Sequence, residues 1–297
     1  MTKPLNGLIS KLAAAATISL MLSPNIAKAW AQSHWPNSLI LSTGGSGQDS
    51  RTAMAQLRMA VLDVHYLSIA VDQSIESLDG VELKTRGGSL AIGSDPIAEW
   101  SLEAGLDFSG IADQYSIREP RLRLTFAPYS LEGWDVAIEA QSASFIFANR
   151  PNILFSTSEV ELQTRGLRID SGFSFRSGFS VRAWYEKSEL SPDFDEMDRP
   201  LLALVIPESA IATATSWAEE RWGLGLGYAR RKWGVYSRAE TQRAKVSREI
   251  SRTLSMSGDW RWSKRIWNSI RVSQSKSLTD TAAEPSGSMS IDLGVNF

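Results

Sequence analysis

Apolar and polar residues alternate along most of the chain beyond residue 31, in runs of eight to eleven residues. The segment 99–108, EWSLEAGLDF, is one example, in which every second position is apolar: Trp100, Leu102, Ala104, Leu106 and Phe108. Successive side chains of a β-strand point to opposite faces of the sheet. A period of two therefore predicts strands with one apolar face and one polar face.

The alternation divides the chain into a series of predicted antiparallel strands. Fourteen segments qualify, and twelve or sixteen strands stay possible because the first and eighth show the weakest pattern: 38–44, 52–61, 64–73, 81–92, 97–109, 117–127, 133–147, 155–171, 173–186, 215–230, 232–244, 251–262, 265–275 and 287–297. Bacterial single-chain membrane barrels have an even number of strands. The count is therefore compatible with a closed up-and-down barrel.

The two faces of these strands favour a membrane barrel over a soluble β-sandwich, which would also alternate. One face is aromatic and aliphatic and the other is heavily charged, as in a wall between lipid and water. Tryptophans gather at strand ends, where indole rings suit the membrane interface: Trp100, Trp134, Trp233, Trp260, Trp262 and Trp267. Tight connections such as 231–232 alternate with long ones such as 187–213. A sheet in lipid must close, because its edge groups would otherwise lack hydrogen-bond partners.

The first 31 residues differ from the rest of the chain and are expected to be a signal peptide. They contain Lys3, Lys11 and Lys28, no acidic residue, and the apolar run LAAAATISLM. This run is too short to span a bilayer as a helix, and Ala29-Trp30-Ala31 fits a small-x-small cleavage pattern. A retained N-terminal anchor is the alternative. Cleavage would leave residues 32–297 as the barrel.

These features together resemble Gram-negative outer-membrane β-barrel proteins of the porin-like class. The last strand ends in MSIDLGVNF, and its terminal Phe297 is similar to the C-terminal signal that the barrel assembly machinery reads. The resemblance implies an all-β transmembrane antiparallel barrel in the outer membrane, exported through the periplasm. It also implies outer-membrane lipid and lipopolysaccharide as surroundings. It identifies no specific functional family.

The polar face of the strands is predicted to line the lumen. Its charges alternate in sign between neighbouring strands, which indicates cross-strand ion pairs, a transverse field across a wet pore, or both. The charged residues assigned to the lumen are Glu82, Lys84, Arg86, Glu99, Glu103, Asp107, Arg121, Arg123, Asp135, Glu139, Arg182, Glu186, Arg238 and Glu240. With 31 basic and 33 acidic residues in the chain, no strong ion selectivity is expected.

Two segments of nearly identical sequence lie on predicted strands, VELKTRG at 81–87 and VELQTRG at 160–166. In each, the apolar positions change phase after the glycine. A glycine within a strand often marks a β-bulge, which would shift the phase in this way. Bulges are therefore predicted at Gly87 and Gly166, and independent strand requirements explain the repeat more simply than a duplication.

Candidate chemistry is sparse. The chain has no Cys and only two His, which excludes disulfides and thiolate sites and leaves His65 without a catalytic partner. The glycines of GLGLG at 223–227 lack the Lys-Ser/Thr of a phosphate-binding loop. The acidic run at 193–198 could hold a divalent cation, but a solvated loop is the simpler interpretation. The near-neutral charge argues against nucleic acid, and no metal or cofactor is expected.

The function that this pattern favours is a passive porin-like channel for small polar solutes. A closed barrel with a structural, adhesive or assembly role is the alternative, and an outer-membrane lipid-modifying enzyme is a third. An apolar run interrupts the long acidic connection: Leu201, Leu202, Leu204, Val205 and Ile206. A water-exposed loop has no reason to carry such a cluster. The run is therefore predicted to fold inward and constrict the pore, with an external contact surface as the alternative.

Overall fold

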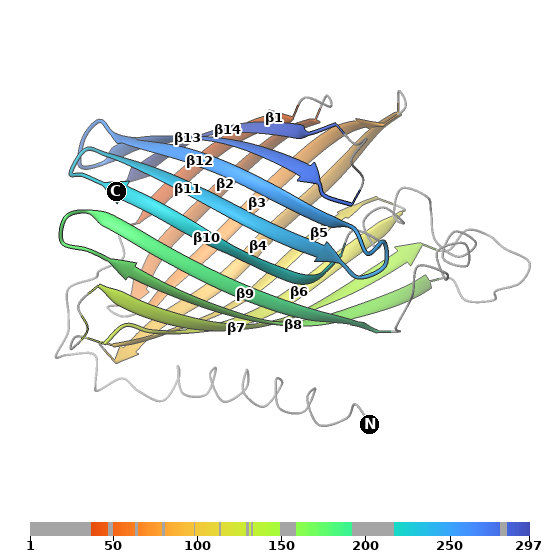
Figure 1. Ribbon diagram of the computed structural model, residues 1–297, viewed down its shortest axis with the longest axis horizontal. Helices are drawn as coiled ribbons and strands as arrows, with labels where there is room; N and C mark the ends of the chain where they lie inside the picture. The colour runs from red at the N-terminus through yellow and green to blue at the C-terminus, as the bar shows by residue number, and fades with distance from the viewer. Residues whose placement is uncertain are drawn as a thin grey trace, which may run out of the picture.

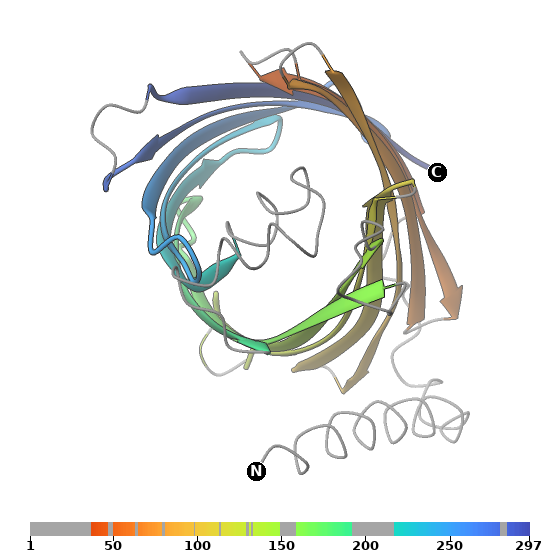
Figure 2. The ribbon, with the colours of Figure 1, turned by 90° about the vertical axis from the view of Figure 1, so that its right-hand side faces the viewer.

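The structure, a computed structural model, is a closed ring of antiparallel strands (Figures 1 and 2). It describes residues 37–46, 50–62, 65–78, 81–97, 99–112, 114–128, 131, 133–148, 159–191, 217–279 and 284–297. These residues form fourteen strands: β1 (Ser38–Ser46), β2 (Ser50–Leu62), β3 (His65–Leu78), β4 (Val81–Ile97), β5 (Trp100–Ile111), β6 (Tyr115–Phe126), β7 (Trp134–Ala148), β8 (Glu159–Ser174), β9 (Phe179–Ser191), β10 (Ala218–Ala229), β11 (Trp233–Ala244), β12 (Ile250–Arg261), β13 (Ile266–Ser277) and β14 (Ser286–Asn296).

Each strand pairs with the next in sequence, and β14 pairs with β1 to close the ring. The closing pair runs from Ser38 opposite Asn296 to Ser46 opposite Ser288. The Phe297 N–H then donates to the Asn37 carbonyl oxygen at 2.9 Å. The predicted fourteen-strand closed barrel is confirmed. The predicted signal peptide, residues 1–31, lies outside the described residues, and no described helix is long and apolar enough to cross a membrane.

The two ends of the barrel differ in their connections. At the end where β1 begins and β14 ends, hereafter the turn end, tight turns join β8 to β9, β10 to β11 and β12 to β13 (Figure 1). Gly178 in the first of these turns has φ +93°, a left-handed conformation that glycine adopts without steric cost. At the opposite end, hereafter the loop end, residues 192–217 connect β9 to β10.

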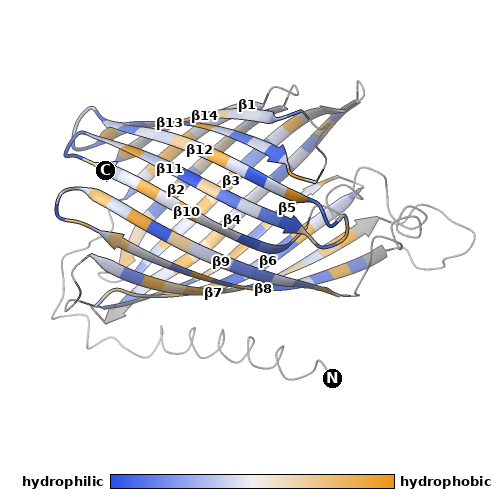
Figure 3. Ribbon diagram, viewed as in Figure 1, coloured by the Kyte–Doolittle hydropathy of each residue, from blue (hydrophilic) through white to orange (hydrophobic). Residues whose placement is uncertain are grey.

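The outer wall carries a broad belt of exposed apolar side chains. Figure 3 shows how hydrophobic and hydrophilic residues recur along the strands. On β5 the belt runs from Trp100 to Phe108, roughly 26 Å along the strand. Aromatic rings border it at the turn end, where the Trp100 and Phe126 ring centroids are 4.5 Å apart and those of Tyr228 and Trp233 are 5.7 Å apart. A belt bordered by aromatic rings is typical of barrels that face lipid. Trp267, predicted to belong to this border, instead points inward.

Several strands continue farther toward the loop end than predicted. β3 ends at Leu78 rather than at residue 73, and β9 ends at Ser191 rather than at residue 186. The outward positions where the prediction ended are polar: Gln73 is the last predicted residue of β3, and Lys187 is the first residue of the β9 extension. The prediction stopped where the outer face ceased to be apolar, whereas the hydrogen-bonded ladder continues.

The predicted bulges at Gly87 and Gly166 are wrong. The β3–β4 and β7–β8 ladders run through both glycines without a shift, and the shifts lie elsewhere, at Ala60/Leu62, Ser94/Ile97 and Ala218/Glu220. A continuous register puts Glu82, Lys84 and Arg86 on the same face as the exposed Leu90. These three residues were assigned to the lumen, and they point outward instead.

Candidate solute pathway

One sector of the inner wall, formed by β5 to β11, is held together by ion pairs. At its centre the Asp170 carboxylate on β8, whose side chain is 1% exposed, accepts hydrogen bonds at Oδ1 from Arg123 of β6 and Arg182 of β9. The Arg123 Nη2 atom lies 3.0 Å from Oδ1 and 2.8 Å from Oδ2, and the Arg182 Nη1 atom lies 2.6 Å from Oδ1. Because two guanidinium groups bind this one carboxylate, it links β8 to its neighbour β9 and, across β7, to β6.

Further ion pairs extend this sector in both directions. On β6, Arg121 reaches Glu103 at 3.3 Å and Asp107 at 3.2 Å. On β10, Arg221 reaches Glu186 of β9 and Glu240 of β11, each at 3.5 Å. The predicted pairing of opposite charges on adjacent strands is therefore present. We call this surface the charged sector.

Aromatic side chains lie among these charges. Trp184 on β9 has the Arg238 guanidinium 4.2 Å from its ring centroid, and Tyr66 on β3 has that of Arg58 at 3.8 Å. Tyr66 also donates a hydrogen bond to Glu103. Neither aromatic residue was predicted to line the lumen, although Trp184 alternates in phase with the inward Arg182 and Glu186, and that phase indicates an inward side chain.

A second sector of the inner wall, formed by β12, β13, β14 and β1, is lined mainly by small hydroxyl side chains. We call it the hydroxyl sector; its inward residues include Ser251, Thr253, Ser255, Ser257, Ser269, Ser273, Ser275, Ser277, Ser286, Ser288, Ser290, Ser38, Ser42 and Ser46. Hydroxyl pairs link neighbouring strands, as between Ser273 and Ser288 at 2.6 Å. This sector was not predicted from the sequence, because serine side chains produce no pattern of charge.

A cavity of about 360 Å³ lies where the two sectors meet. Tyr236, Arg238 and Glu240 of β11 form one side, and Thr253, Ser255, Arg271 and Ser273 belong to the other. Arg271 makes no ion pair within the described part of the chain. The cavity therefore combines hydroxyl groups, an aromatic ring and a cation that can face a polar solute.

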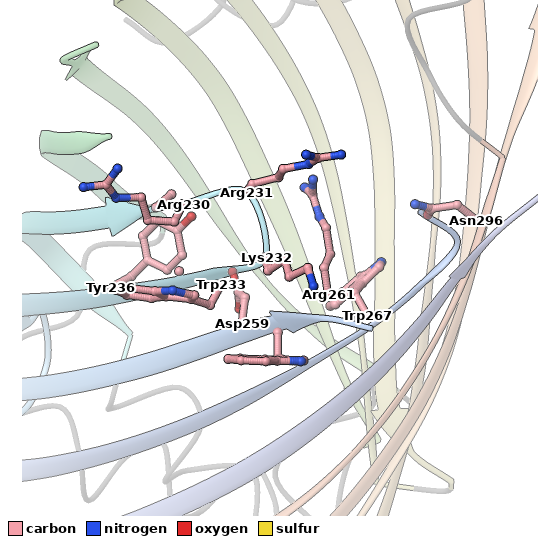
Figure 4. A pocket seen from close by; sticks show the side chains of 12 residues that line it. Arg230, Arg231, Lys232, Trp233, Tyr236, Asp259, Arg261, Trp267 and Asn296 are labelled. Atoms are coloured by element: carbon pink, nitrogen blue, oxygen red, sulfur yellow. The ribbon is translucent and has the colours of Figure 1, made fainter. Parts of the chain in front are cut away.

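A second cavity, of about 250 Å³, lies at the turn end below the first and shares Tyr236 with it. Figure 4 shows Arg230, Arg231 and Lys232 in the turn between β10 and β11, together with Arg261. Asp259 is the one acidic residue in the lining. This mouth of the lumen consequently has a local excess of positive charge.

Buried apolar side chains dominate the inner wall near the loop end along β7 to β11, with the buried hydroxyl groups of Thr164 and Ser188 among them. The Phe145 ring of β7 packs edge-on against Trp217 with a centroid distance of 4.8 Å. Leu162 of β8 is 1% exposed and Val246, after β11, is fully buried. The inner wall therefore changes from charged to apolar along the barrel axis.

Most sequence-predicted lumen residues lie on the inner wall: Glu103, Asp107, Arg121, Arg123, Asp135, Glu139, Arg182, Glu186, Arg238 and Glu240. Glu99 lies in the turn that precedes β5. The predicted constriction residues, Leu201, Leu202, Leu204, Val205 and Ile206, lie outside the described residues. Among the described side chains, no group of three or more His, Asp or Glu is arranged to hold a metal ion.

No protein-family model matches the chain, and no curated protein matches it. Solved structures with a similar fold include the CymD monoaromatic hydrocarbon channel, at 11% identity over 94% of this chain and 92% of that one, with a TM-score of 0.58. The Pseudomonas putida toluene transporter TodX is 9% identical over 92% of this chain and 92% of that one, with a TM-score of 0.53. A Pseudomonas aeruginosa FadL homologue is 7% identical over 88% of this chain and 89% of that one, with a TM-score of 0.52. The chain thus has the fold of outer-membrane β-barrel proteins.

Proposed function

We propose that the protein is a passive, non-enzymatic channel for small polar solutes in the outer membrane of a Gram-negative bacterium. The observation that carries this proposal is the division of the inner wall into a charged sector and a facing hydroxyl sector. In the hydroxyl sector short side chains leave room, and the cavity beside Arg271 lies along it. Such a lining suits water and hydroxylated solutes.

The number of strands supports an open interior. Barrels of about eight strands are filled by their own side chains, whereas those of sixteen to eighteen strands leave an aqueous channel. Fourteen strands lie near the wider class, and arginines such as Arg238 and Arg182 on the inner wall keep nearly half of their side-chain surface exposed. Ion pairs along the charged sector brace the wall without filling the pore.

The solute class follows from the lining rather than from the similar structures. CymD and TodX are named as a channel for monoaromatic hydrocarbons and a toluene transporter. The inner wall of this chain is charged or hydroxylated over the half nearest the turn end. We therefore expect polar solutes to pass, and the cations of the turn-end mouth favour anions modestly over cations.

Membrane orientation and assembly follow the common arrangement of such barrels. Short turns face the periplasm and long loops face outward, so the turn end would be periplasmic. Phe297, 63% exposed beside the closing strand pair, would provide the C-terminal assembly signal. Deleting Phe297 should remove the folded barrel from outer membranes; unchanged amounts of folded barrel there would refute this role.

Planar-bilayer conductance of the refolded protein tests the channel proposal. Ser255→Trp would place a bulky ring in the hydroxyl sector, and Met256→Trp would place the same ring on the lipid side of the same strand. We expect stable conductance steps that Ser255→Trp lowers about twofold or more while Met256→Trp leaves them unchanged. The absence of steps from the folded wild-type protein would contradict the proposal.

A closed structural barrel is the second candidate, and the buried apolar residues at the loop end favour it. Phe145, Leu162 and Val246 are buried there, and the polar side chains buried near them, Thr164 and Ser188, are small. A barrel sealed at this level would fold normally, resist denaturation in lipid and give no conductance. The same bilayer recordings therefore distinguish the two candidates.

A further inference from the structure

Three exposed cations lie close together on the outer wall near the loop end. Lys84 and Arg86 belong to β4 and Arg118 belongs to β6, all with outward side chains. Arg86 is opposite Gly110 of β5, and Arg118 is opposite Phe108 of the same strand. With strands about 4.8 Å apart and a two-residue offset, the Arg86 and Arg118 backbones lie roughly 12 Å from one another. Their long side chains can therefore reach one ligand.

One acidic residue, Glu82, lies on the same stretch of outer wall as these three cations. None of the three cations makes an ion pair with a described residue, and Glu82 is the only acid among the described outward positions of β3 to β7. Like charges on one face repel. The excess of positive charge indicates an external anion.

On β8 to β11 the same level of the outer wall carries balanced charges. Arg165 of β8 is opposite Glu189 of β9 in the register. Arg243 Nη2 of β11 lies 3.4 Å from Glu220 Oε2 of β10. The cluster on β4 and β6 thus differs from β8 to β11. Arg252 of β12, opposite Lys276 of β13, is a smaller group of two outward cations at this end.

The floor of the cluster is apolar. The Phe108 ring lies over Gly88, because a Cβ added at Gly88 would be 2.6 Å from Phe108 Cζ. Leu90, the next outward residue on β4, is 48% exposed and continues into the apolar belt. A ligand that contacts both the cations and this apolar surface needs an anionic head group and an apolar tail.

We propose that Lys84, Arg86 and Arg118 bind the phosphate groups of lipopolysaccharide, with its acyl chains against Phe108 and Leu90. Guanidinium groups bind phosphate through paired N–H donors, and lysine adds a mobile positive charge. The proposed orientation puts this end of the barrel in the outer leaflet, where lipopolysaccharide lies. The site goes beyond solute passage and would exist in a conducting or a closed barrel alike.

The test is lipid binding to the full-length refolded barrel in neutral detergent, followed by native mass spectrometry. The probes are bisphosphorylated lipid A, its monophosphorylated form and phosphatidylglycerol. The test variant combines Lys84→Gln, Arg86→Gln and Arg118→Gln. The matched control combines Arg231→Gln, Lys264→Gln and Arg265→Gln, which removes the same number of exposed lysines and arginines at the turn end.

Bisphosphorylated lipid A should bind the wild-type and control proteins, and the test variant should bind it roughly tenfold more weakly. Loss of one phosphate should weaken binding to the wild type. Equal binding to the test and wild-type proteins, no binding to the wild type, or equal binding of phosphatidylglycerol would overturn the proposal. If the triple variant does not migrate as a folded, heat-modifiable barrel, Arg86→Gln and Arg118→Gln are measured singly against the same criteria.

Discussion

The two halves of strand β8 show opposite arrangements of apolar and polar residues. Toward the turn end, Leu167 and Ile169 point outward while Arg168 and Asp170 point into the lumen. Toward the loop end, Gln163 and Arg165 point outward while Leu162 is buried inside, in the same continuous register: Glu161 opposite Ile146 through Ile169 opposite Ile138. The strand is not bulged between the halves, so the environment on each side changes and the backbone does not.

This contrast shows that the alternation of a barrel strand is defined by the environment at each level. Beside the apolar belt, lipid selects Leu167 for the outer face and water in the lumen selects charge for the inner face. Nearer the loop end the outer face meets polar surroundings, and neighbouring side chains such as Phe145 pack against the inner face. The repeat VELQTRG is therefore the loop-end arrangement of β8, and VELKTRG is the same arrangement of β4.

The largest difference in the free energy of unfolding should appear when an arginine is placed on the outer face, either within the apolar belt or near the loop end. Leu224→Arg, at a position 49% exposed in the middle of β10, should destabilise the barrel by about 2–4 kcal/mol. Gln163→Arg, outward at the loop end, should cost about 0–1 kcal/mol. Urea unfolding in lipid vesicles measures both. Equal losses at the two positions would contradict a change of environment along the wall.

A slightly smaller effect should follow from emptying the apolar inner wall. Leu162→Ala removes a side chain that is 1% exposed, and we expect a loss of about 2–3 kcal/mol in the free energy of unfolding. Ser255→Ala, inward in the hydroxyl sector, should change it by less than about 0.5 kcal/mol. A cost for Leu162→Ala no greater than that for Ser255→Ala would show that the loop-end interior is wet rather than packed.

The sequence was sufficient for the strand count and the closure but not for this inversion. Strand segments are local features, and their alternation in 99–108 or 287–297 is visible without knowing what lies on either side. The inward placement predicted for Lys84 failed because it assumed that apolar residues always face outward. The partners of Asp170 depend on the register between strands and on contact across an intervening strand, which no local pattern contains.

The ion pairs of the charged sector should contribute less, because the arginines are partly hydrated. Asp170→Asn removes the buried carboxylate that Arg123 and Arg182 share, and should cost about 1–2 kcal/mol. Asp107→Asn breaks a single ion pair, with Arg121, that is more exposed to water. This substitution should cost less than about 0.5 kcal/mol. The comparison is read from unfolding at low salt. Equal costs would mean that Asp170 does not bridge the neighbouring strands.

The most direct test of the account is the accessibility of single cysteines along β8, which is clean because the chain contains no Cys. Leu162→Cys, Gln163→Cys and Leu167→Cys variants, refolded into lipid vesicles, would be treated with a membrane-impermeant maleimide. We predict rapid labelling at position 163 and protection at positions 162 and 167, by protein packing and by lipid respectively. Labelling at 162 with protection at 163 would contradict the inversion and restore a single lipid-facing phase along the strand.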